Sequence, residues 1–389
     1  MSTEKNSLDV IAGGKYILWG ANWSLYTAKV RPYLIKKRVD YVEVCPSHPH
    51  YSDHIIPTVG YFSVPVLETP EGEIIADSTR IMEHLEAKFP DPPMLPEDKA
   101  LAALAYLIHC FGSEGLHKSA MYQRWNTSYE NRLFARNEFK RTTATPEVAD
   151  TFAVSMRSYL PVLGIGLDHS VDVAIEKSID ALYESLNAHF LRYPYILGGL
   201  PSMADYGLMG PLYAHHGRDV SSSNRMKVNA PAVYRWVETM LRPPIVDQET
   251  WDVPQEYFSV DELPDTLHAF LKLIGKHYIP EVKAVIGLYH DWLDAEDRPA
   301  GAIVDVEGKK RCHQVLGEID HVQMDTFIHR IGLLDDVSQH SRFQAQMDQM
   351  SDSEMKSLRK ILKGMGAGDY ADLRLKRDVK RQDYVWVLV

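Results

Sequence analysis

Cysteine and excess positive charge are both scarce in this chain of 389 residues. The three cysteines, Cys45, Cys110 and Cys312, lie far apart and form no C-x-x-C pair, which excludes a disulfide framework and a zinc ribbon and favours a reducing compartment. The formal net charge is −11, with no long basic block. Nucleic acid and anionic membranes are therefore unexpected partners, because both need a cationic face.

Long apolar runs are also missing. The longest one, LAALAYLIHCF at 101–111, is too short to span a bilayer. Residues 1–14 have mixed charges and lack the apolar segment of a signal peptide. We therefore expect a soluble, cytoplasmic protein. Hydrophobic residues make up 45% of the sequence, which is enough for packed cores, and the length predicts two or three domains.

Between residues 15 and 90, short β-like runs alternate with helical patterns in the order βαβ followed by ββα. The runs VPVLE and EIIAD are separated by TPEG, in which Pro70 and Gly72 favour a type I turn and hence a hairpin. A right-handed βαβ unit and a hairpin that share one small sheet are the simplest assembly. After the proline-rich break DPPMLPED, helical patterns dominate to about residue 245.

These patterns divide the chain into four parts: an N-terminal tail (1–14), an α/β domain (15–90), an all-helical domain (97–245) and a mixed, mostly helical extension (246–389).

The extension carries helical patterns at 264–293 and 352–365 and a more β-like stretch at 302–319. Two of its segments, WDVPQEYFSV and the closing DYVWVLV, are apolar enough to need burial. We expect the extension to dock on the body, either beside the cleft between the domains as a lid or against a second subunit.

Ser24 stands where an apolar strand ends and a helical pattern begins, in WGANWSLYTAKVR. One interpretation is an N-cap, whose hydroxyl accepts a hydrogen bond from an amide of the first turn. A second interpretation is an anion site, because a hydroxyl at a helix N-terminus can donate to a negative group where the helix end adds positive potential. One hydroxyl can accept one bond and donate another.

Four short motifs, in order, resemble those of glutathione S-transferases: SLYTAKVR from Ser24, VPVL from Val64, DSTRI from Asp77 and SMAD from Ser202. The resemblance covers about residues 15–245 and implies a thioredoxin-like first domain, in which the Val64–Pro65 bond is cis, followed by an all-helical domain. The extension has no counterpart in the common two-domain form of the family.

The resemblance also implies roles in binding glutathione as a co-substrate. Ser24 would hold the thiolate, which must be stabilised because a free thiol is mostly protonated at pH 7. Serine rather than cysteine at this place argues for nucleophilic transfer and against thiol–disulfide chemistry. The backbone of Val64, before Pro65, would pair with the cysteinyl part, Asp77 would face the α-ammonium group, and Ser78 would take the α-carboxylate. Simple helix capping by Asp77 and Ser78 is the alternative.

The loop before the predicted cis proline contains His48, His50 and His54. A metal site is one interpretation, but Asp53 is the only acidic residue nearby, and we expect no metal. A contact with the glycine carboxylate of glutathione is a second interpretation, which we assign to His54. A solvated loop is the third.

An apolar pocket between the domains is the expected place for a second substrate. Seven residues are candidates for its wall: Phe111, Tyr122 and Tyr213, together with the four that we select, Trp23, Tyr26, Met121 and Trp125. Most aromatic residues at helical spacing belong to a core instead. Arg124 and Glu114 are interpreted as surface charges, and His215 and His216 as helix-end residues.

Together these patterns predict an enzyme that activates the thiol of glutathione for attack on a hydrophobic, electrophilic small molecule. The resemblance further implies a homodimer and a role in detoxification. The alternative is a catalytically silent scaffold whose extension binds a protein partner. Ser24, Val64–Pro65 and Asp77–Ser78 at matched places favour the enzyme.

Overall fold

A four-stranded mixed sheet forms the first folded unit in the computed structural model, which describes all residues except 1–7, 9–11 and 144. Its strand order is β2-β1-β3-β4, with β1 parallel to β2 and antiparallel to β3. The elements are β1 (Tyr16–Trp19), α2 (Thr27–Lys36), β2 (Tyr41–Val44), α3 (Ile56–Val59), β3 (Val66–Glu68), β4 (Ile74–Ala76) and α4 (Ser78–Lys88). This confirms the predicted thioredoxin-like order. The expected tail, 1–14, falls mostly outside the described residues.

The hairpin between β3 and β4 turns through 69–72, as the sequence predicts. The amide of Gly72 donates to the carbonyl of Thr69 at 2.9 Å, and Gly72 has a φ of +84°, a conformation that glycine adopts without steric cost. The Val64–Pro65 peptide bond before β3 is cis. The Val64 carbonyl lies 3.4 Å from the Ser24 Oγ, just before α2.

The next part of the chain is helical, as expected. It contains α5 (Lys99–Cys110), α6 (His117–Tyr122), α7 (Tyr129–Thr142), α8 (Pro146–Ser158), α9 (His169–Phe190), α10 (Met203–Pro211), α11 (Val220–Asn229) and α12 (Pro231–Met240), with π-helical turns at Phe111–Gly115, Gln123–Thr127 and Leu212–His216. No helix among the described residues is both long and apolar enough to cross a membrane.

Helix α10 begins at the fourth predicted motif. The buried carboxylate of Asp205 accepts hydrogen bonds from the backbone and hydroxyl of Ser202, at 2.9 and 2.8 Å, and from the Trp236 indole at 3.2 Å. Burial raises the pKa of Asp205 to about 6, although these hydrogen bonds favour the ionised form. The predicted capping box is therefore present and lies inside the core.

The extension contains both helices and strands: α13 (Asp265–His277), α14 (Ile279–Ala295), β5 (Val315–Gln323), β6 (Thr326–Leu333), α15 (Leu334–Met347), α16 (Asp352–Gly364), β7 (Val379–Gln382) and β8 (Val385–Leu388). The helix expected over 264–293 is divided at Tyr278, whose φ and ψ of −120° and −40° end α13 before α14 begins at Ile279, with Pro280 in its first turn. Proline suits the first turn of a new helix because it lacks an amide hydrogen. Helix α15 was not predicted.

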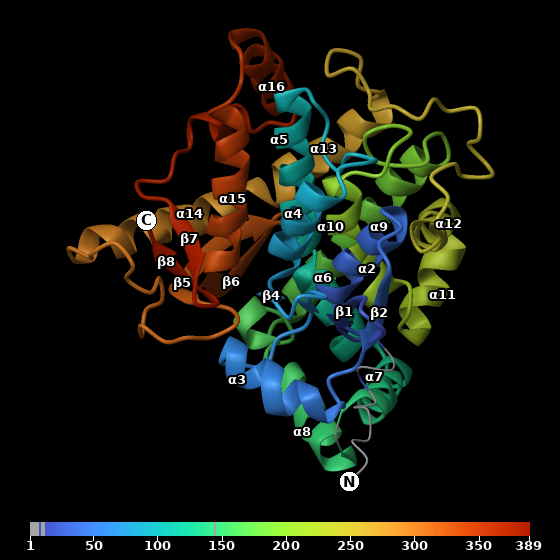
Figure 1. The fold of residues 1–389 in the computed structure, drawn as a ribbon. Helices are drawn as coiled ribbons and strands as arrows, with labels where there is room; N and C mark the ends of the chain where they lie inside the picture. The colour runs from blue at the N-terminus through green and yellow to red at the C-terminus, as the bar shows by residue number, and fades with distance from the viewer. Residues whose placement is uncertain (1–7, 9–11, 144) are drawn as a thin grey trace.

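The extension packs against the body along one side, where α15 runs beside α5 (Figure 1). All four residues of β8 are buried, so the apolar C-terminal segment is covered, as expected. The other segment differs from expectation, because Trp251 lies in a loop with 72% of its surface exposed.

Buried charges join the extension to the helical domain. Glu281 in α14 pairs with Lys118 in α6 and with Arg330 in β6, whose Nε lies 2.6 Å from the Glu281 Oε1 atom. Arg330 also lies 3.0 Å from Asp336 in α15. All four side chains are almost completely buried, so the loss of one partner would strand an uncompensated charge in the interior.

Candidate functional site

A cavity of about 230 Å³ opens between the N-terminal sheet domain, the helical domain and the extension. Its wall includes the start of α2, the loop before β3, helices α6 to α8 and the loop before β5. Trp23, Ser24, Tyr26, Phe62, Ser63, Val64, His117, Met121, Arg124, Trp125, Phe139, Phe152, Tyr159, His215, Cys312 and His313 line it, with Leu25 and Met156. Most of this wall is apolar, as in typical small-molecule sites.

Ser24 lies in this wall with its side chain almost fully buried. Its Oγ accepts a hydrogen bond from the amide of Thr27, the first residue of α2, and its carbonyl accepts one from the Ala28 amide, both at 3.1 Å. Ser24 therefore makes the hydrogen bonds of an N-cap, although Tyr26 is the residue that directly precedes α2. The same hydroxyl donates to the Val64 carbonyl over a long 3.4 Å. Ser24 therefore combines capping with a weakly held proton that faces the cavity's edge.

The four residues selected for the apolar pocket, Trp23, Tyr26, Met121 and Trp125, all line the cavity. The other three candidates, Phe111, Tyr122 and Tyr213, do not. The Trp23 indole donates to Thr142 Oγ1 at 2.7 Å, which fixes its ring.

Glu114 was interpreted as a surface charge, and this is wrong. It is 9% exposed and accepts a hydrogen bond from the Tyr26 hydroxyl at 3.1 Å. Burial and the nearby Asp335 raise the pKa of Glu114, whereas burial lowers the pKa of Lys29, which faces it. The pattern of polar and apolar residues along a helix cannot distinguish an exposed charge from one that a later segment of the chain covers.

Arg124 was also interpreted as a surface charge and is instead 3% exposed. Its guanidinium pairs with Asp219 at 2.9 Å and donates to the Trp23 carbonyl at 2.9 Å. His215 and His216 lie at a helix end, as predicted, but both are buried. Burial lowers the pKa of His216 to about 3.

A smaller cavity, of about 40 Å³, adjoins the first at the start of α4. It is lined by Pro65, Asp77, Ser78, Thr79, Ser63, Val64, Tyr26, Lys29 and Glu114, and by Cys312, His313, Asp335, Gln339 and Arg381 from the extension. This volume holds only a few water molecules.

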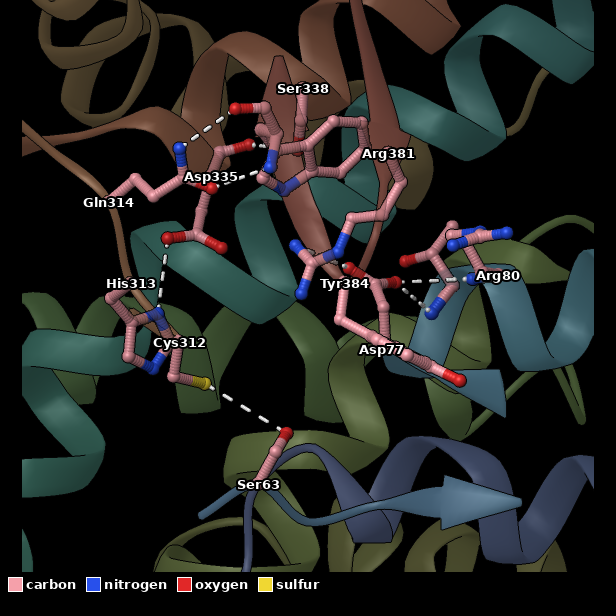
Figure 2. A network of polar contacts seen from close by, with 12 residues as sticks. Ser63, Asp77, Arg80, Cys312, His313, Gln314, Asp335, Ser338, Arg381 and Tyr384 are labelled. Atoms are coloured by element: carbon pink, nitrogen blue, oxygen red, sulfur yellow. Dashed lines mark hydrogen bonds and ion pairs between the residues drawn. The ribbon is translucent and has the colours of Figure 1, made fainter. Parts of the chain in front are cut away.

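Asp77 caps α4 and also faces a cation. Its Oδ1 accepts from the amides of Thr79 and Arg80 at 2.9 and 3.1 Å, so the capping interpretation is present. Its Oδ2 lies 3.8 Å from the guanidinium of Arg381 in β7 (Figure 2). Burial would raise the pKa of Asp77, but Arg381 and Arg342 outweigh it and hold that pKa below its usual value.

The extension adds a cysteine and a histidine, Cys312 and His313, to the wall shared by both cavities, and a carboxylate, Asp335, to the wall of the smaller one (Figure 2). His313 Nδ1 lies 3.1 Å from Asp335 Oδ2, and Cys312 Sγ lies 3.9 Å from Ser63 Oγ. Burial would raise the pKa of the Cys312 thiol, but the adjacent His313 outweighs it and the pKa is lowered. Sequence reasoning missed this cluster, because Asp335 and Cys312 meet only through the fold.

The histidine-rich segment, expected as a loop, is partly helical, because His54 lies in a π-helical turn over Tyr51–Ile55 that leads into α3. His54 is exposed, lines neither cavity and contacts the ring of His50 at a centroid distance of 4.8 Å. His50 stacks on Trp19 and lies 3.5 Å from Glu68. The structure therefore lends no support to His54 as a contact of a ligand in these cavities.

Comparisons with known proteins identify the first domain. Residues 18–93 match the family model for the N-terminal domain of glutathione S-transferase. A search of curated protein sequences found no match.

Several solved structures are similar in fold to part of the chain. A glutathione S-transferase from Rhodospirillum rubrum is 18% identical over 59% of this chain and 89% of its own, with a TM-score of 0.39. The β-etherase LigF from a Sphingobium species is 17% identical over 61% and 99%, also with a TM-score of 0.39. The tau-class enzyme MiGSTU from mango is 18% identical over 68% and 100%, with a TM-score of 0.37.

Proposed function

Because residues 18–93 match the family model for the N-terminal domain of glutathione S-transferase, we propose that this chain is a glutathione-dependent transferase that acts on a hydrophobic electrophile. Glutathione would lie along Val64, Pro65, Asp77 and Ser78, with its sulfur beside Ser24. The acceptor would occupy the larger cavity, against Trp23, Tyr26, Met121 and Trp125, which all line it together with Ser24.

The observation that carries this proposal is the position of the Ser24 hydroxyl. It lies just before α2 and lines the apolar cavity, and within the described part of the chain its hydrogen has one acceptor, the Val64 carbonyl, at 3.4 Å. The hydroxyl can donate its hydrogen bond to an incoming thiolate instead of the Val64 carbonyl, and its oxygen can still accept from the Thr27 amide. The helix end adds favourable positive potential.

In the reaction, the sulfur anion attacks an electrophilic carbon and forms a C–S bond. The displaced pair of electrons leaves with a departing group or moves onto an adjacent activated atom, which then takes a proton. The apolar wall keeps water away from the sulfur, so that the hydrogen bond from Ser24 is stronger than it would be in water. The glutathionyl head must first displace side chains, because the pocket at Asp77 is about 40 Å³.

One observation favours the second candidate, a silent scaffold. The guanidinium of Arg381 lies 3.8 Å from Asp77, on the carboxylate that would face the ammonium group of glutathione. A scaffold could keep this pocket closed permanently. An enzyme needs Arg381 to turn away when glutathione enters.

Calorimetric titration with reduced glutathione separates the two. The enzyme predicts saturable binding to the full chain, whereas the scaffold predicts none. Ser24→Ala should bind glutathione nearly as tightly, since the hydroxyl acts mainly on the sulfur, whereas Asp77→Asn should bind it more weakly. Ser128→Ala is a matched control, because Ser128 caps α7 in the same way, by accepting from the Asn131 amide at 3.1 Å. The proposal would be contradicted if glutathione gave no heat of binding with the unsubstituted chain or with any of the variants.

The remaining expectations are part of the same proposal. We propose a homodimer, a cytoplasmic location and a role in detoxification, and we retain the division at 15–90, 97–245 and 246–389. Sedimentation velocity of the full chain tests the dimer, which a single monomeric species at micromolar concentration would contradict.

A further inference from the structure

Cys312 lies where the extension closes the site. The cysteine belongs to the loop before β5, and it lines both the apolar cavity and the smaller pocket at Asp77. Its sulfur lies 3.9 Å from the Ser63 hydroxyl, and Ser63 directly precedes Val64, whose carbonyl meets Ser24. A thiol from the extension thus faces the same space as the serine of the first domain.

The sulfur has a charge partner. His313 follows Cys312 in the chain, and its Nδ1 lies 3.1 Å from the Asp335 carboxylate (Figure 2). Burial would lower the pKa of His313, but Cys312 and Asp335 outweigh it and raise that pKa well above its usual value. A protonated imidazole beside a sulfur favours the thiolate.

The other titratable and charged groups near this pair come from several elements. His313 makes ring contacts with Tyr26, His117 and Tyr159 at centroid distances of 5.7, 6.4 and 6.4 Å. Further groups that interact with the sulfur or the imidazole are Arg381, Glu114, Tyr51 and Tyr61, and Arg330 and Lys118 act on the neighbouring His117.

A second, independent feature points to a ligand here. Trp125 and His215 line the larger cavity together with Cys312 and are 4% and 3% exposed. The Trp125 Nε1 and the His215 Nδ1 have no hydrogen-bond partner in the described part of the chain. A buried polar atom without a partner is costly, and a carbonyl or carboxylate oxygen of a bound molecule would accept the hydrogen of the Trp125 indole.

We propose that Cys312 exchanges with glutathione disulfide and carries a glutathionyl group as a mixed disulfide. The Cys312 thiolate attacks one sulfur of the disulfide, so that a Cys312–S bond forms and the original S–S bond breaks. The leaving glutathione thiolate departs with the electron pair and takes a proton from His313 or from solvent. This inference rests on the proposed glutathione site but adds a redox activity to it.

The proposal also revises what the serine implies. A serine rather than a cysteine at position 24 argues against thiol–disulfide exchange only if no other part of the chain brings a cysteine to the site. Here the extension supplies a cysteine to the opposite wall. Ser24 would then stabilise the departing thiolate, and Cys312 would be the attacking one.

Two double variants of the full chain provide the test. C45S/C110S keeps only Cys312, and C110S/C312S keeps only Cys45, which is half-buried to a similar degree. Burial and the nearby Glu43 raise the pKa of Cys45. At about pH 6, where an ordinary thiol is almost entirely protonated, exchange with glutathione disulfide should be ~10-fold or more faster in the chain that keeps Cys312, after allowing for the weaker nucleophilicity of a low-pKa thiolate.

Intact-mass spectrometry follows the addition of one glutathionyl group, and peptide mapping locates it. H313Q on the C45S/C110S background should slow the reaction at about pH 6 and move its rate–pH profile upward by about one unit or more. A purely structural role for His313 would leave the profile in place. Equal rates in the two double variants, or an unchanged profile in H313Q, would overturn the proposal.

Two further arms separate the reactive thiol from the glutathione site. Hydroxyethyl disulfide, a small disulfide without glutathionyl groups, should react more slowly than glutathione disulfide at equal concentration. An equal rate would overturn the binding part of the inference. C312S should still bind reduced glutathione, as calorimetry would show. If C312S and the unsubstituted chain bind it equally well, but glutathione disulfide adds no glutathionyl group to the unsubstituted chain, only the Cys312 proposal fails.

Discussion

Two walls that border the adjoining cavities differ in how they are built. The first wall comes from the sheet domain, where Ser24, Val64 and Asp77 lie at element ends within short motifs. The second wall comes from the extension, where Cys312, with its partner His313, and Arg381 are brought together from distant positions in the sequence (Figure 2). Local capping chemistry builds the first wall, and long-range packing builds the second.

The charge network around Glu281 holds the second wall to the helical domain, so breaking it should have the largest effect. Glu281→Gln leaves Lys118 and Arg330 without their shared carboxylate. We expect a loss of about 3–5 kcal/mol in the free energy of unfolding, the usual cost of stranding a buried charge. Chemical denaturation measures it.

Asp150→Asn is the matched control, since it breaks the exposed pair between Asp150 and Arg136. That change should cost far less, because water screens an exposed ion pair. Similar losses in the two variants would mean that the buried network does not hold the second wall.

The same network predicts a pH dependence. Burial would raise the pKa of Glu281, but Arg330 and Lys118 outweigh it and lower the pKa to about 2, below the value of about 4.3 for an unfolded glutamate. Its contribution is therefore complete above about pH 4.3 and is lost as the pH falls towards 2. The stability difference between the unsubstituted chain and Glu281→Gln should shrink over this window, as acid denaturation would measure; a constant difference would contradict it.

Breaking the first wall should have the next largest effect. Ser24→Ala should lower turnover with an electrophile by ~10²-fold, because a hydrogen-bond donor to the reacting sulfur is lost. Steady-state kinetics with saturating glutathione measure this, with Ser128→Ala as the capping control. Unchanged turnover would mean that a neighbour such as Tyr26, rather than Ser24, donates the hydrogen bond to the sulfur.

The contact between the walls should have a smaller effect. Arg381→Met removes the cation that faces Asp77 and enlarges the pocket at the start of α4. We expect glutathione to bind up to about five-fold more tightly, since one partly shielded ion pair is worth at most about 1 kcal/mol. Calorimetry measures the change.

Arg80→Met is the control for that variant, because Asp77 accepts from the Arg80 backbone amide rather than from its guanidinium. Weaker binding by Arg381→Met would show instead that Arg381 holds the ligand's carboxylate, and the two walls would then cooperate rather than compete.

The smallest effect should come from a part of the extension that belongs to neither wall. Trp251 is 72% exposed, and Trp251→Ala should change the free energy of unfolding by no more than about 0.5 kcal/mol. Trp386, in the buried strand β8, is 4% exposed, and Trp386→Ala should cost about 3–5 kcal/mol. Thermal unfolding of both variants checks the contrast, and a large loss for Trp251→Ala would contradict it.

The first wall could be predicted from sequence because its signals are local. A strand that ends at Ser24, a proline that opens the hairpin at Pro65 and an acid that begins a helix at Asp77 each leave a short pattern. The whole thioredoxin-like order follows from such patterns.

The second wall leaves no local pattern. Glu114 and Arg124 look like surface charges on a helix until the extension and neighbouring helices cover them. Cys312 and Arg381 are 69 positions apart in the printed sequence, and only the packing of β7 and β8 beside α15 brings them to one pocket. Periodicity predicts that such segments are buried, but not what they touch.

The most direct test of the account is a crystal structure of the full chain with reduced glutathione. The account predicts the tripeptide along Val64 and Asp77, with its sulfur within hydrogen-bond distance of the Ser24 hydroxyl and with Arg381 turned away from Asp77. A sulfur that faces away from Ser24, or a tripeptide bound outside both cavities while Arg381 stays on Asp77, would contradict it.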